Sequence, residues 1–481
     1  MAFNLQQAPS YYKSGDKLPG ADPAIAAFVK ENLKKVLHIP PGNKVLANHP
    51  SFSLLRPDPV PLAKILEECT HIPKPHHILY VSLPFCLPTQ PENCGFCLFP
   101  KVDLQNRSQI RTYLDYLQRE LEIVTPPIKI KELDAIYFGG GTPNILNPEE
   151  CKDYVSLVLK YFTLKKGGEI TFEGIPQLFT QEDKFQALKE AGVTRISIGV
   201  QQLHDHLISL SGRKQKREHI LKALEHTHHH GLNHNLDLIY GWPQQTHDDA
   251  LSDIQTLIEW QVPHITAYPL NILKDLSAFS RPPLRERIPD IHLFIKMYQT
   301  IRDKLSDHGY RQRTMSDFEK INADSDFKYE TLSHDPLNCD IYAIGFSGGF
   351  RICGLPEKMG CGYLSPHILK DYYDQIDEGR IPYRAGILYA IEDLELVYIC
   401  NQLQENRLYR DLYQAHFGKD VVDQFLPLWQ AFLDLGWVEI DNHEIRLIDQ
   451  GVFYSAHIQR TLSYQRTQEL KTHQVLKGYK E

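Results

Sequence analysis

The sequence predicts an α/β fold: a partial, TIM-like (β/α)6 barrel with an N-terminal extension and a C-terminal, mostly helical domain that resembles a winged helix. Two observations carry the prediction. Six apolar, strand-like runs alternate with amphipathic helical segments, and such alternation builds a parallel sheet with helical crossovers. Near the end of the chain, a helical run precedes two short strand-like runs joined by Asp441-Asn442, which is the outline of a helix packed on a hairpin.

The strand-like runs of the barrel are short and rich in Ile, Val, Leu, Phe and Tyr. We expect strands at residues 78–83, 133–138, 169–173, 194–200, 234–240 and 264–270. The helices between them are expected at 108–124, 148–162, 181–191, 216–230 and 247–260, where apolar residues recur at i, i+3, i+4 and i+7. In barrels of this type, functional residues follow the carboxyl ends of the strands.

With 481 residues, the chain exceeds one ordinary domain. We expect four parts: an N-terminal cover at 1–77, the barrel at 78–308, an irregular Gly- and Cys-containing connection at 309–368, and a C-terminal helical domain at 369–481.

Composition narrows the class of partner. A net charge of −8 argues against a general nucleic-acid or anionic-membrane binder, because both need a concentrated positive field. We find no basic start followed by an apolar core, and no run of about 18 apolar residues. The nine cysteines fit a reducing compartment. We therefore expect a cytoplasmic protein with a small-molecule partner.

The first strand leads into the stretch ILYVSLPFCLPTQPENCGFCLF, which contains Cys86, Cys94 and Cys97. Three thiolates can hold one iron–sulfur cluster, and a cubane [4Fe–4S] cluster with three Cys ligands has one iron open to a small molecule. Zinc and three unrelated thiols are the alternatives. Zinc is disfavoured because no His or fourth Cys lies close in sequence.

Further polar or glycine positions follow the next strands. Gly139, Gly140, Gly141 and Thr142 follow the second strand in FGGGTP, where glycines let the backbone approach a ligand, although tight turns also use them. Glu173 ends the third strand and Gln201 follows the fourth. Each of these two is by itself also typical of a polar rim residue.

Two charged residues are expected at the same end of the barrel, its mouth, which the carboxyl ends of the strands form. Arg213 lies twelve residues beyond Gln201, and Asp237 interrupts the apolar strand HNLDLIY. A carboxylate inside a strand needs a partner or a ligand hydroxyl.

A histidine-rich stretch offers a second metal hypothesis. It contains His226, His228, His229, His230 and His234, most of them at a helix end, where imidazoles favour the helix dipole. Since the run has no consistent one-face spacing, we expect surface histidines rather than a metal site.

The other cysteines are expected to be structural. Cys339, Cys353 and Cys361 have spacings unlike any standard cluster motif, and Cys69, Cys151 and Cys400 lie in helix-like runs.

Taken together, these motifs resemble the radical S-adenosylmethionine (SAM) superfamily, and more closely its oxygen-independent coproporphyrinogen III oxidase-like branch. The resemblance spans roughly residues 78 to 464. It rests on YVSLPFC with CGFC, GGGTP, RISIGVQ, the SGR ending at Arg213, DLIYGWPQQT, the GFSGG loop and LKDYYDQIDEG.

The resemblance implies an oxidoreductase. In that family, the three cysteines hold a [4Fe–4S] cluster, its open iron binds SAM, and one electron generates a 5′-deoxyadenosyl radical that removes a hydrogen atom from substrate. Carried over by position, Tyr80 and the GGGTP loop would contact SAM, and Glu173, Gln201, Arg213 and Asp237 would complete its pocket. These residues are expected to bind the cofactor, and no catalytic residue is assigned.

Three features depart from the family's pattern. Seven residues separate Cys86 from Cys94, where the family has three. Ser82 stands where a His is common. Phe99 replaces the extra cysteine that true coproporphyrinogen oxidases carry two residues beyond the third ligand.

The expected substrate is a tetrapyrrole, as in porphyrin biosynthesis, with Arg311, Arg313 and Arg351 as further cations for its propionates. The alternatives are a radical methyltransferase or cyclopropanase acting on haem or another aromatic, and a haem-binding chaperone. We expect a monomer and an electron donor such as flavodoxin or ferredoxin.

Overall fold

The computed structural model describes residues 11–38, 49–57, 62–69, 74–272, 277–321, 327–352 and 360–476. The chain forms two compact units. The larger contains Leu55–Gln312 and Ser316–Tyr389, and the smaller contains Met1–Leu54, Arg313–Met315 and Ala390–Glu481. The boundaries expected after residues 77, 308 and 368 stay predictions.

The larger unit is organised around six parallel strands. They are β2 (His76–Leu83), β5 (Glu132–Gly140), β6 (Thr163–Gly174), β7 (Arg195–Gln201), β8 (Asn233–Tyr240) and β9 (His264–Pro269). Each strand pairs in parallel with the next along the chain. The six predicted strands are therefore confirmed, because their apolar runs are buried between the helices and the sheet interior.

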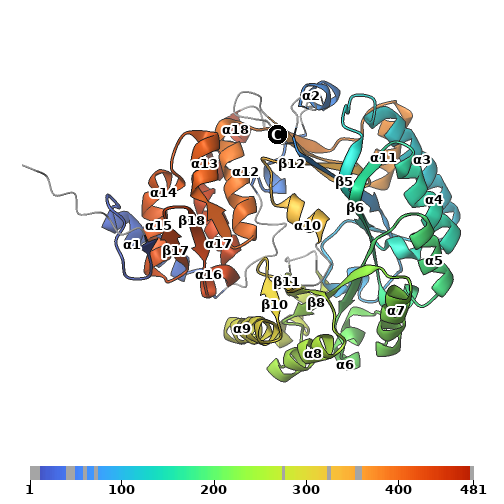
Figure 1. Cartoon of the computed structure of the whole chain (residues 1–481), viewed down its shortest axis with the longest axis horizontal. Coiled ribbons are helices and arrows are strands. Elements are labelled where there is room, and N and C mark those ends of the chain that lie inside the picture. The colour runs from blue at the N-terminus through green and yellow to red at the C-terminus, as the bar shows by residue number, and fades with distance from the viewer. Residues whose placement is uncertain are drawn as a thin grey trace, which may run out of the picture. The chain divides into compact units, whose positions relative to one another are not determined.

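Helices connect these strands on the outside of the sheet (Figure 1). They are α3 (Ser108–Val124), α4 (Pro148–Leu159), α5 (Glu182–Glu190), α6 (Asp205–Ile208), α7 (Arg217–His229), α8 (His247–Glu259) and α9 (Ile291–Asp307). Local sequence sets several starts: the Asn147 side chain accepts a hydrogen bond from the Glu150 backbone at the start of α4, and Thr246 does the same for α8.

The region 309–368 differs from the irregular connection that we expected. It contains β10 (Tyr310–Gln312), β11 (Asp317–Lys320), α10 (Lys328–Ser333), β12 (Cys339–Gly345), β13 (Gly349–Ile352) and β14 (Cys361–Leu364). These strands extend the sheet at both edges, together with β15 (Ala385–Leu388), and β12 pairs in parallel with β2. The prediction was wrong because short strands buried on both faces show no alternating pattern.

Helix α10 packs against β2, β5, β6 and β12. The Glu169 carboxylate of β6 accepts hydrogen bonds from the backbone N–H groups of Lys328 and Tyr329 at the start of α10. The Tyr329 ring lies 5.1 Å from the Tyr137 ring, between ring centroids. The larger unit also contains α2 (Leu62–Cys69) and, between β14 and β15, α11 (Leu369–Asp377).

The smaller unit joins the N-terminal segment to the C-terminal helices. Its helices are α1 (Pro23–Lys34), α12 (Ile391–Gln404), α13 (Arg410–Phe417), α14 (Val421–Gln424), α15 (Leu426–Asp434), α16 (Gln450–Phe453), α17 (Ser455–Leu462) and α18 (Tyr464–Leu476). Its sheet has the order β1 (Tyr11–Tyr12), β17 (Val438–Asp441), β18 (Glu444–Leu447), β16 (Arg407–Tyr409).

The expected helix and hairpin are present as α15, β17 and β18. The turn is Asn442-His443 rather than Asp441-Asn442, since Asp441 belongs to β17 and pairs with Tyr11 of β1.

Four of the cysteines expected to be structural are fully buried: Cys151, Cys339, Cys361 and Cys400. Cys339 packs against Ile78 and Ala135 in the core. Cys353 and the side chain of Cys69 lie outside the described residues.

Candidate active site

The carboxyl ends of the parallel strands bring the predicted site residues together. In the strand register, Tyr80 of β2 stands beside Tyr137 of β5, Glu173 of β6 beside Ser197 of β7, and Asp237 of β8 beside Gly199 of β7. Parallel pairing in chain order therefore brings residues of five strands together at the mouth of the barrel.

The cysteine loop begins at this mouth and is held at its base by a short parallel pair, β3 (Phe85–Cys86) with β4 (Val102–Asp103). The Leu104 N–H donates to the Cys86 carbonyl at 2.9 Å. Within the loop, the Cys94 N–H donates to Thr89 Oγ1 at 2.9 Å. The lengthened segment between the first two cysteines is thus folded back onto the second cysteine by its own side chain.

Side-chain hydrogen-bond donors approach two of the three sulfurs, and the Phe99 backbone donates to the third, that of Cys97. Thr142 Oγ1 donates to Cys86 Sγ at 3.3 Å, and Arg213 Nε donates to Cys94 Sγ at 3.5 Å. Burial raises the pKa of Cys86 to about 12, and it also raises the pKa of Cys97. Donors of this kind suit thiolates that ligate a metal.

The distances between the three sulfurs indicate whether the cysteines suit an iron–sulfur cluster or a single metal ion. A single zinc ion holds each thiolate at ~2.3 Å, so its ligand atoms lie close together. Among the described residues, the one group of three such ligand atoms within 4.8 Å of one another is Glu182, His229 and His230, and not the cysteines. The three thiols therefore fit a larger, multi-iron group better than one zinc ion.

The glycine turn is a place of close approach. A Cβ at Gly139 would lie 2.7 Å from both Glu173 Oε2 and the Tyr80 hydroxyl. Gly140 has φ +107°, and its Cβ would lie 2.7 Å from the Leu83 carbonyl oxygen. A side chain is excluded at Gly140, where the backbone itself stands in the way, whereas a side chain at Gly139 would have to displace the Glu173 and Tyr80 side chains. The turn is tight, and it also lies directly beside the polar residues of the mouth.

Two carboxyl groups of the mouth lack full compensation. Burial raises the pKa of Glu173 to about 8, and the neighbouring Asp237 carboxylate adds to the rise. Burial likewise raises the pKa of Asp237 to about 6, although the Asn235 amide, which donates to Asp237 Oδ1 at 3.0 Å, lowers it. The mouth therefore favours a cationic ligand, which would stabilise both carboxylates.

Gln201 and Arg213 occupy the same side of the mouth. Gln201 has φ +68°, a strained conformation for a residue with a side chain. Arg213 Nη1 donates to the Gly199 carbonyl at 2.8 Å, and its guanidinium lies 5.4 Å from the centre of the Phe96 ring. These contacts hold Arg213 next to Cys94 and over the cysteine loop.

Sequence reasoning assigned no site role to Tyr137 or Ser82. Tyr137 stacks on Tyr80 at 5.7 Å between ring centroids, and its hydroxyl lowers the pKa of Glu173 through a hydrogen bond. Ser82 Oγ would lie 2.6 Å from a Cβ at Gly140. Strand alternation could have found both, since each is two residues from a predicted site residue on the same strand face.

The histidine-rich stretch is only partly on the surface. His228 and His229 are exposed, but His226 and His234 are buried, and His226 Nε2 lies 3.3 Å from the Thr180 carbonyl oxygen. The expectation of surface histidines was wrong for these two residues. His226 is on the face of α7 that packs on α5, where its ring centroid lies 5.3 Å from that of Phe185, and His234 belongs to the buried strand β8.

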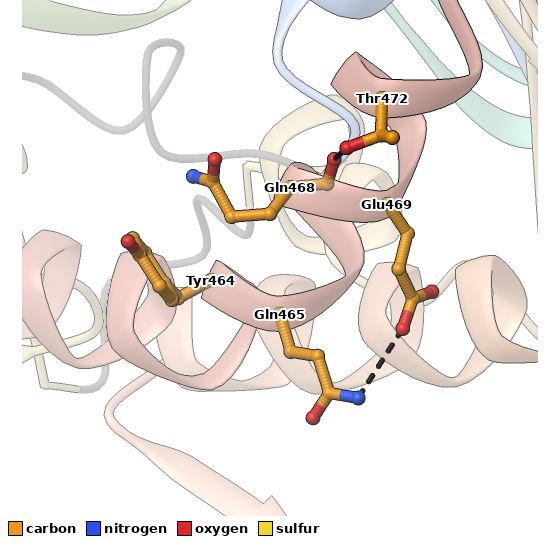
Figure 2. Close-up of a pocket in the computed structure, with 5 residues that line it drawn as sticks. All are labelled: Tyr464, Gln465, Gln468, Glu469 and Thr472. Atoms are coloured by element: carbon orange, nitrogen blue, oxygen red, sulfur yellow. Dashed lines mark hydrogen bonds between the residues drawn. The ribbon is translucent and has the colours of Figure 1, made fainter. Parts of the chain in front are cut away.

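A hollow of about 510 Å³ lies along α18 in the smaller unit (Figure 2). Its lining side chains all come from that one helix: Tyr464, Gln465, Gln468, Glu469 and Thr472. Gln465 Nε2 donates to Glu469, so the polar groups satisfy one another along the helix. This hollow has none of the cysteines or strand-end residues of the mouth.

Residues 91–257 match the family model described as the Radical SAM superfamily. The chain carries a radical SAM domain. The matched range contains every predicted site residue except Tyr80 and Cys86, which precede the matched range; the long segment between Cys86 and Cys94 spans its start.

Two kinds of curated relative are similar to the chain. The haem chaperone HemW of Buchnera aphidicola is 29% identical over 51% of this chain, and that alignment spans 63% of the relative's length. The oxygen-independent coproporphyrinogen III oxidase of Pseudomonas aeruginosa is 26% identical over 78% of this chain and 82% of its own length.

A solved structure shares the fold of this chain. The coproporphyrinogen III oxidase HemN from Escherichia coli superposes with a TM-score of 0.75, at 22% identity, over 86% of this chain and 96% of its own. The predicted α/β fold and the resemblance to the radical SAM superfamily are therefore confirmed.

The predicted cofactors, a [4Fe–4S] cluster and SAM, are confirmed by the match to the radical SAM domain. Which residues hold each cofactor stays a prediction. In the part of the chain that the structure describes, no helix has the length and apolar character needed to cross a membrane.

Proposed function

We propose that this chain is a radical SAM enzyme acting on a tetrapyrrole, with Cys86, Cys94 and Cys97 as the ligands of its [4Fe–4S] cluster. The observation that carries the proposal is the meeting of the cysteine loop, the glycine turn and the Glu173–Asp237 pair at one end of the parallel sheet. When bound, the cluster and SAM supply the radical chemistry.

The chain's own residues would bind and orient SAM. Gly139, Gly140, Gly141 and Thr142 let the backbone approach the ligand, and Tyr80 lies over the turn. Arg213 holds Cys94 through its Nε donor. SAM carries an ammonium and a sulfonium, and these cations match the two carboxyl groups whose pKa values are raised in the ligand-free site.

The substrate proposal rests on the relatives. The coproporphyrinogen oxidases align over most of this chain, which supports a porphyrin-type substrate and a coproporphyrinogen dehydrogenase-like reaction. Two of the arginines expected to pair with propionates already form ion pairs. Arg311 Nη2 lies 3.1 Å from Glu319 Oε2, and Arg313 Nη2 lies 2.9 Å from Glu405 Oε1. Propionate recognition would therefore require these pairs to open or other cations to act.

A haem-binding chaperone is the second candidate, because the first relatives in the comparison are haem chaperones at 29% and 30% identity. Those alignments span 63% and 62% of the relatives' lengths. The chain also has Phe99 at the position where the family resemblance implies an extra cysteine in true coproporphyrinogen oxidases, which favours a different function. A cytoplasmic location, a flavodoxin- or ferredoxin-type electron donor and a monomeric state stay predictions.

The test is an anaerobic assay of the reconstituted protein with SAM and a reductant, offered coproporphyrinogen III or haem. We expect 5′-deoxyadenosine and loss of carbon dioxide from coproporphyrinogen III. The triple variant C86A/C94A/C97A should hold no cluster iron and form no product.

The outcomes separate the candidates. Stoichiometric haem binding without 5′-deoxyadenosine favours the chaperone. A methylated product from haem favours the methyltransferase alternative. Full cluster content in the triple variant contradicts the assignment of the three ligands.

A further inference from the structure

Helices α5 and α7 bring together three metal-ligating side chains outside the mouth. One ligand atom each from Glu182, His229 and His230 lies within 4.8 Å of the other two. Glu182 is in the first turn of α5, while His229 is the last residue of α7 and His230 follows it. We propose that this group is a binding site for a divalent transition-metal ion of the Zn²⁺ type, independent of the iron–sulfur cluster.

The donor set defines the kind of ion. Two imidazoles and one carboxylate are the ligands that Zn²⁺ takes in sites with three protein ligands, and Cu²⁺ and Ni²⁺ accept the same set. Hard ions such as Mg²⁺ and Ca²⁺ prefer oxygen ligands. The site therefore selects borderline ions.

The rings are available for ligation. Among the described residues, His230 Nε2 is buried and has no hydrogen-bond partner. His229 Nε2 lies 3.4 Å from Glu182 Oε1, so the carboxylate and this ring already face each other. A bound cation would satisfy groups that otherwise have only each other.

Packing holds one of the rings in place. The His230 ring is stacked on Phe185 at 6.1 Å and 17° between planes, and it meets the His229 ring edge-on at 5.0 Å. The His229 and Glu182 side chains are 67% and 61% exposed, so water can complete the coordination.

An ordinary ion pair at a helix end is the competing explanation for Glu182 and His229. It accounts for the 3.4 Å contact, but it leaves the buried His230 Nε2 without a partner. A metal site uses all three residues, and the two explanations differ in what each single substitution does.

The experiment measures Zn²⁺ binding to the full-length, cluster-loaded protein by competition with a chromophoric chelator, with iron counted separately. The variants are E182Q, H229Q and H230F, the last of which keeps an aromatic ring on Phe185. His228 is exposed on the same helix and outside the group, so H228Q is the matched control.

We expect one Zn²⁺ beyond the cluster iron in the wild type and in H228Q. Because the loss of an outer-shell partner alone costs about 10- to 100-fold in metal affinity, each ligand variant should bind at least about tenfold more weakly. Substituted Co²⁺ should show the weak absorption of nitrogen and oxygen ligands without a thiolate charge-transfer band.

Three results would overturn the proposal. They are unchanged affinity in all three ligand variants, an equal loss in H228Q, and an adventitious ion only, seen as non-saturable binding. Absorption of the cluster and circular dichroism report folding; E182Q changes an exposed side chain, so its result stands even if H230F is destabilised. Product formation is not among the readouts, so failure of the tetrapyrrole proposal leaves this one intact.

Discussion

Buried carboxyl groups behave in opposite ways in the two compact units. In the larger unit, burial raises the pKa values of Glu173 and Asp237, and a neighbouring carboxylate adds to each rise: Asp237 acts on Glu173, and Asp317 acts on Asp237. In the smaller unit, burial alone would raise the pKa of Asp393, but hydrogen bonds from Arg466 and His49 outweigh it and hold that pKa well below its usual range. The difference lies in partners rather than in burial.

The contrast distinguishes a carboxylate whose charge is compensated within the protein from two carboxyl groups that we propose bind a ligand. Asp393 has no exposed surface and accepts from Arg466 Nε at 2.9 Å and from His49 Nε2 at 2.9 Å, so its charge is fully compensated within the protein. Glu173 and Asp237 are compensated only in part, and the missing positive charge is what a cationic ligand brings.

Removing the compensated carboxylate should have the largest effect on stability. Asp393→Ala leaves Arg466 and His49 without their shared partner, and breaking a buried pair in this way costs about 3–5 kcal/mol. Urea unfolding measures this loss. Glu392→Ala, at the exposed neighbouring position, should change the free energy of unfolding by less than about 0.5 kcal/mol.

The same carboxylate predicts an acid transition. Because its pKa is lowered in the folded state, its contribution is present above the ordinary pKa of 3.8 and is lost as the pH falls below it. Wild type and Asp393→Ala should therefore converge in stability in acid. A constant difference between them from pH 7 to pH 3 would contradict this assignment.

The glycine turn gives the next largest effect. Gly140→Val places a β-branched side chain at φ +107° and 2.7 Å from the Leu83 carbonyl oxygen, with strain of about 1–3 kcal/mol and overpacking of similar size. We expect loss of SAM binding in equilibrium dialysis. Gly231→Ala, where φ is also positive but open space surrounds the Cβ position, is the control that should keep SAM binding.

Glu173→Gln tests the uncompensated pair. A neutral amide keeps the shape but loses the charge-assisted bond to a cationic ligand, so SAM affinity should fall by about 1.5–3 kcal/mol, measured by isothermal titration. Glu149→Gln, on the exposed surface of α4, should bind SAM as the wild type does.

The same variant changes the response to pH without SAM. The raised pKa of Glu173 means that the folded protein holds its proton more tightly than the unfolded chain, so wild-type stability falls as the pH rises from 4.5 toward about 8. Glu173→Gln should lose less stability over this range, by on the order of 1 kcal/mol after solvent screening at the mouth. An unchanged slope would show that Glu173 is ionised in the ligand-free site.

The smallest effect is expected where both partners are exposed. Lys222 lies 2.8 Å from Glu225 on α7, with side chains 46% and 65% exposed. Lys222→Ala should cost only about 0.2–0.5 kcal/mol, and salt should reduce this further. A loss of unfolding free energy above 1 kcal/mol would mean that an exposed ion pair contributes more to stability than the contrast with the buried carboxylates implies.

The sequence by itself determined the parallel strands and the residues of the mouth. Apolar runs separated by amphipathic helices leave few arrangements other than a parallel sheet in chain order, and functional residues then follow strand ends. Tyr80, Glu173 and Asp237 could be placed in one site for this reason, with no knowledge of their distances.

Only the tertiary structure decided what depends on distant pairing. β12 pairs with β2, although most of the larger unit lies between the two strands in sequence. No local pattern in Cys339–Gly345 identifies β2 as its partner. Likewise, the approach of Glu182 to His229 and His230 follows from the packing of α5 on α7. Local periodicity records which face of an element is buried, whereas the identity of the element that covers it is set by long-range packing.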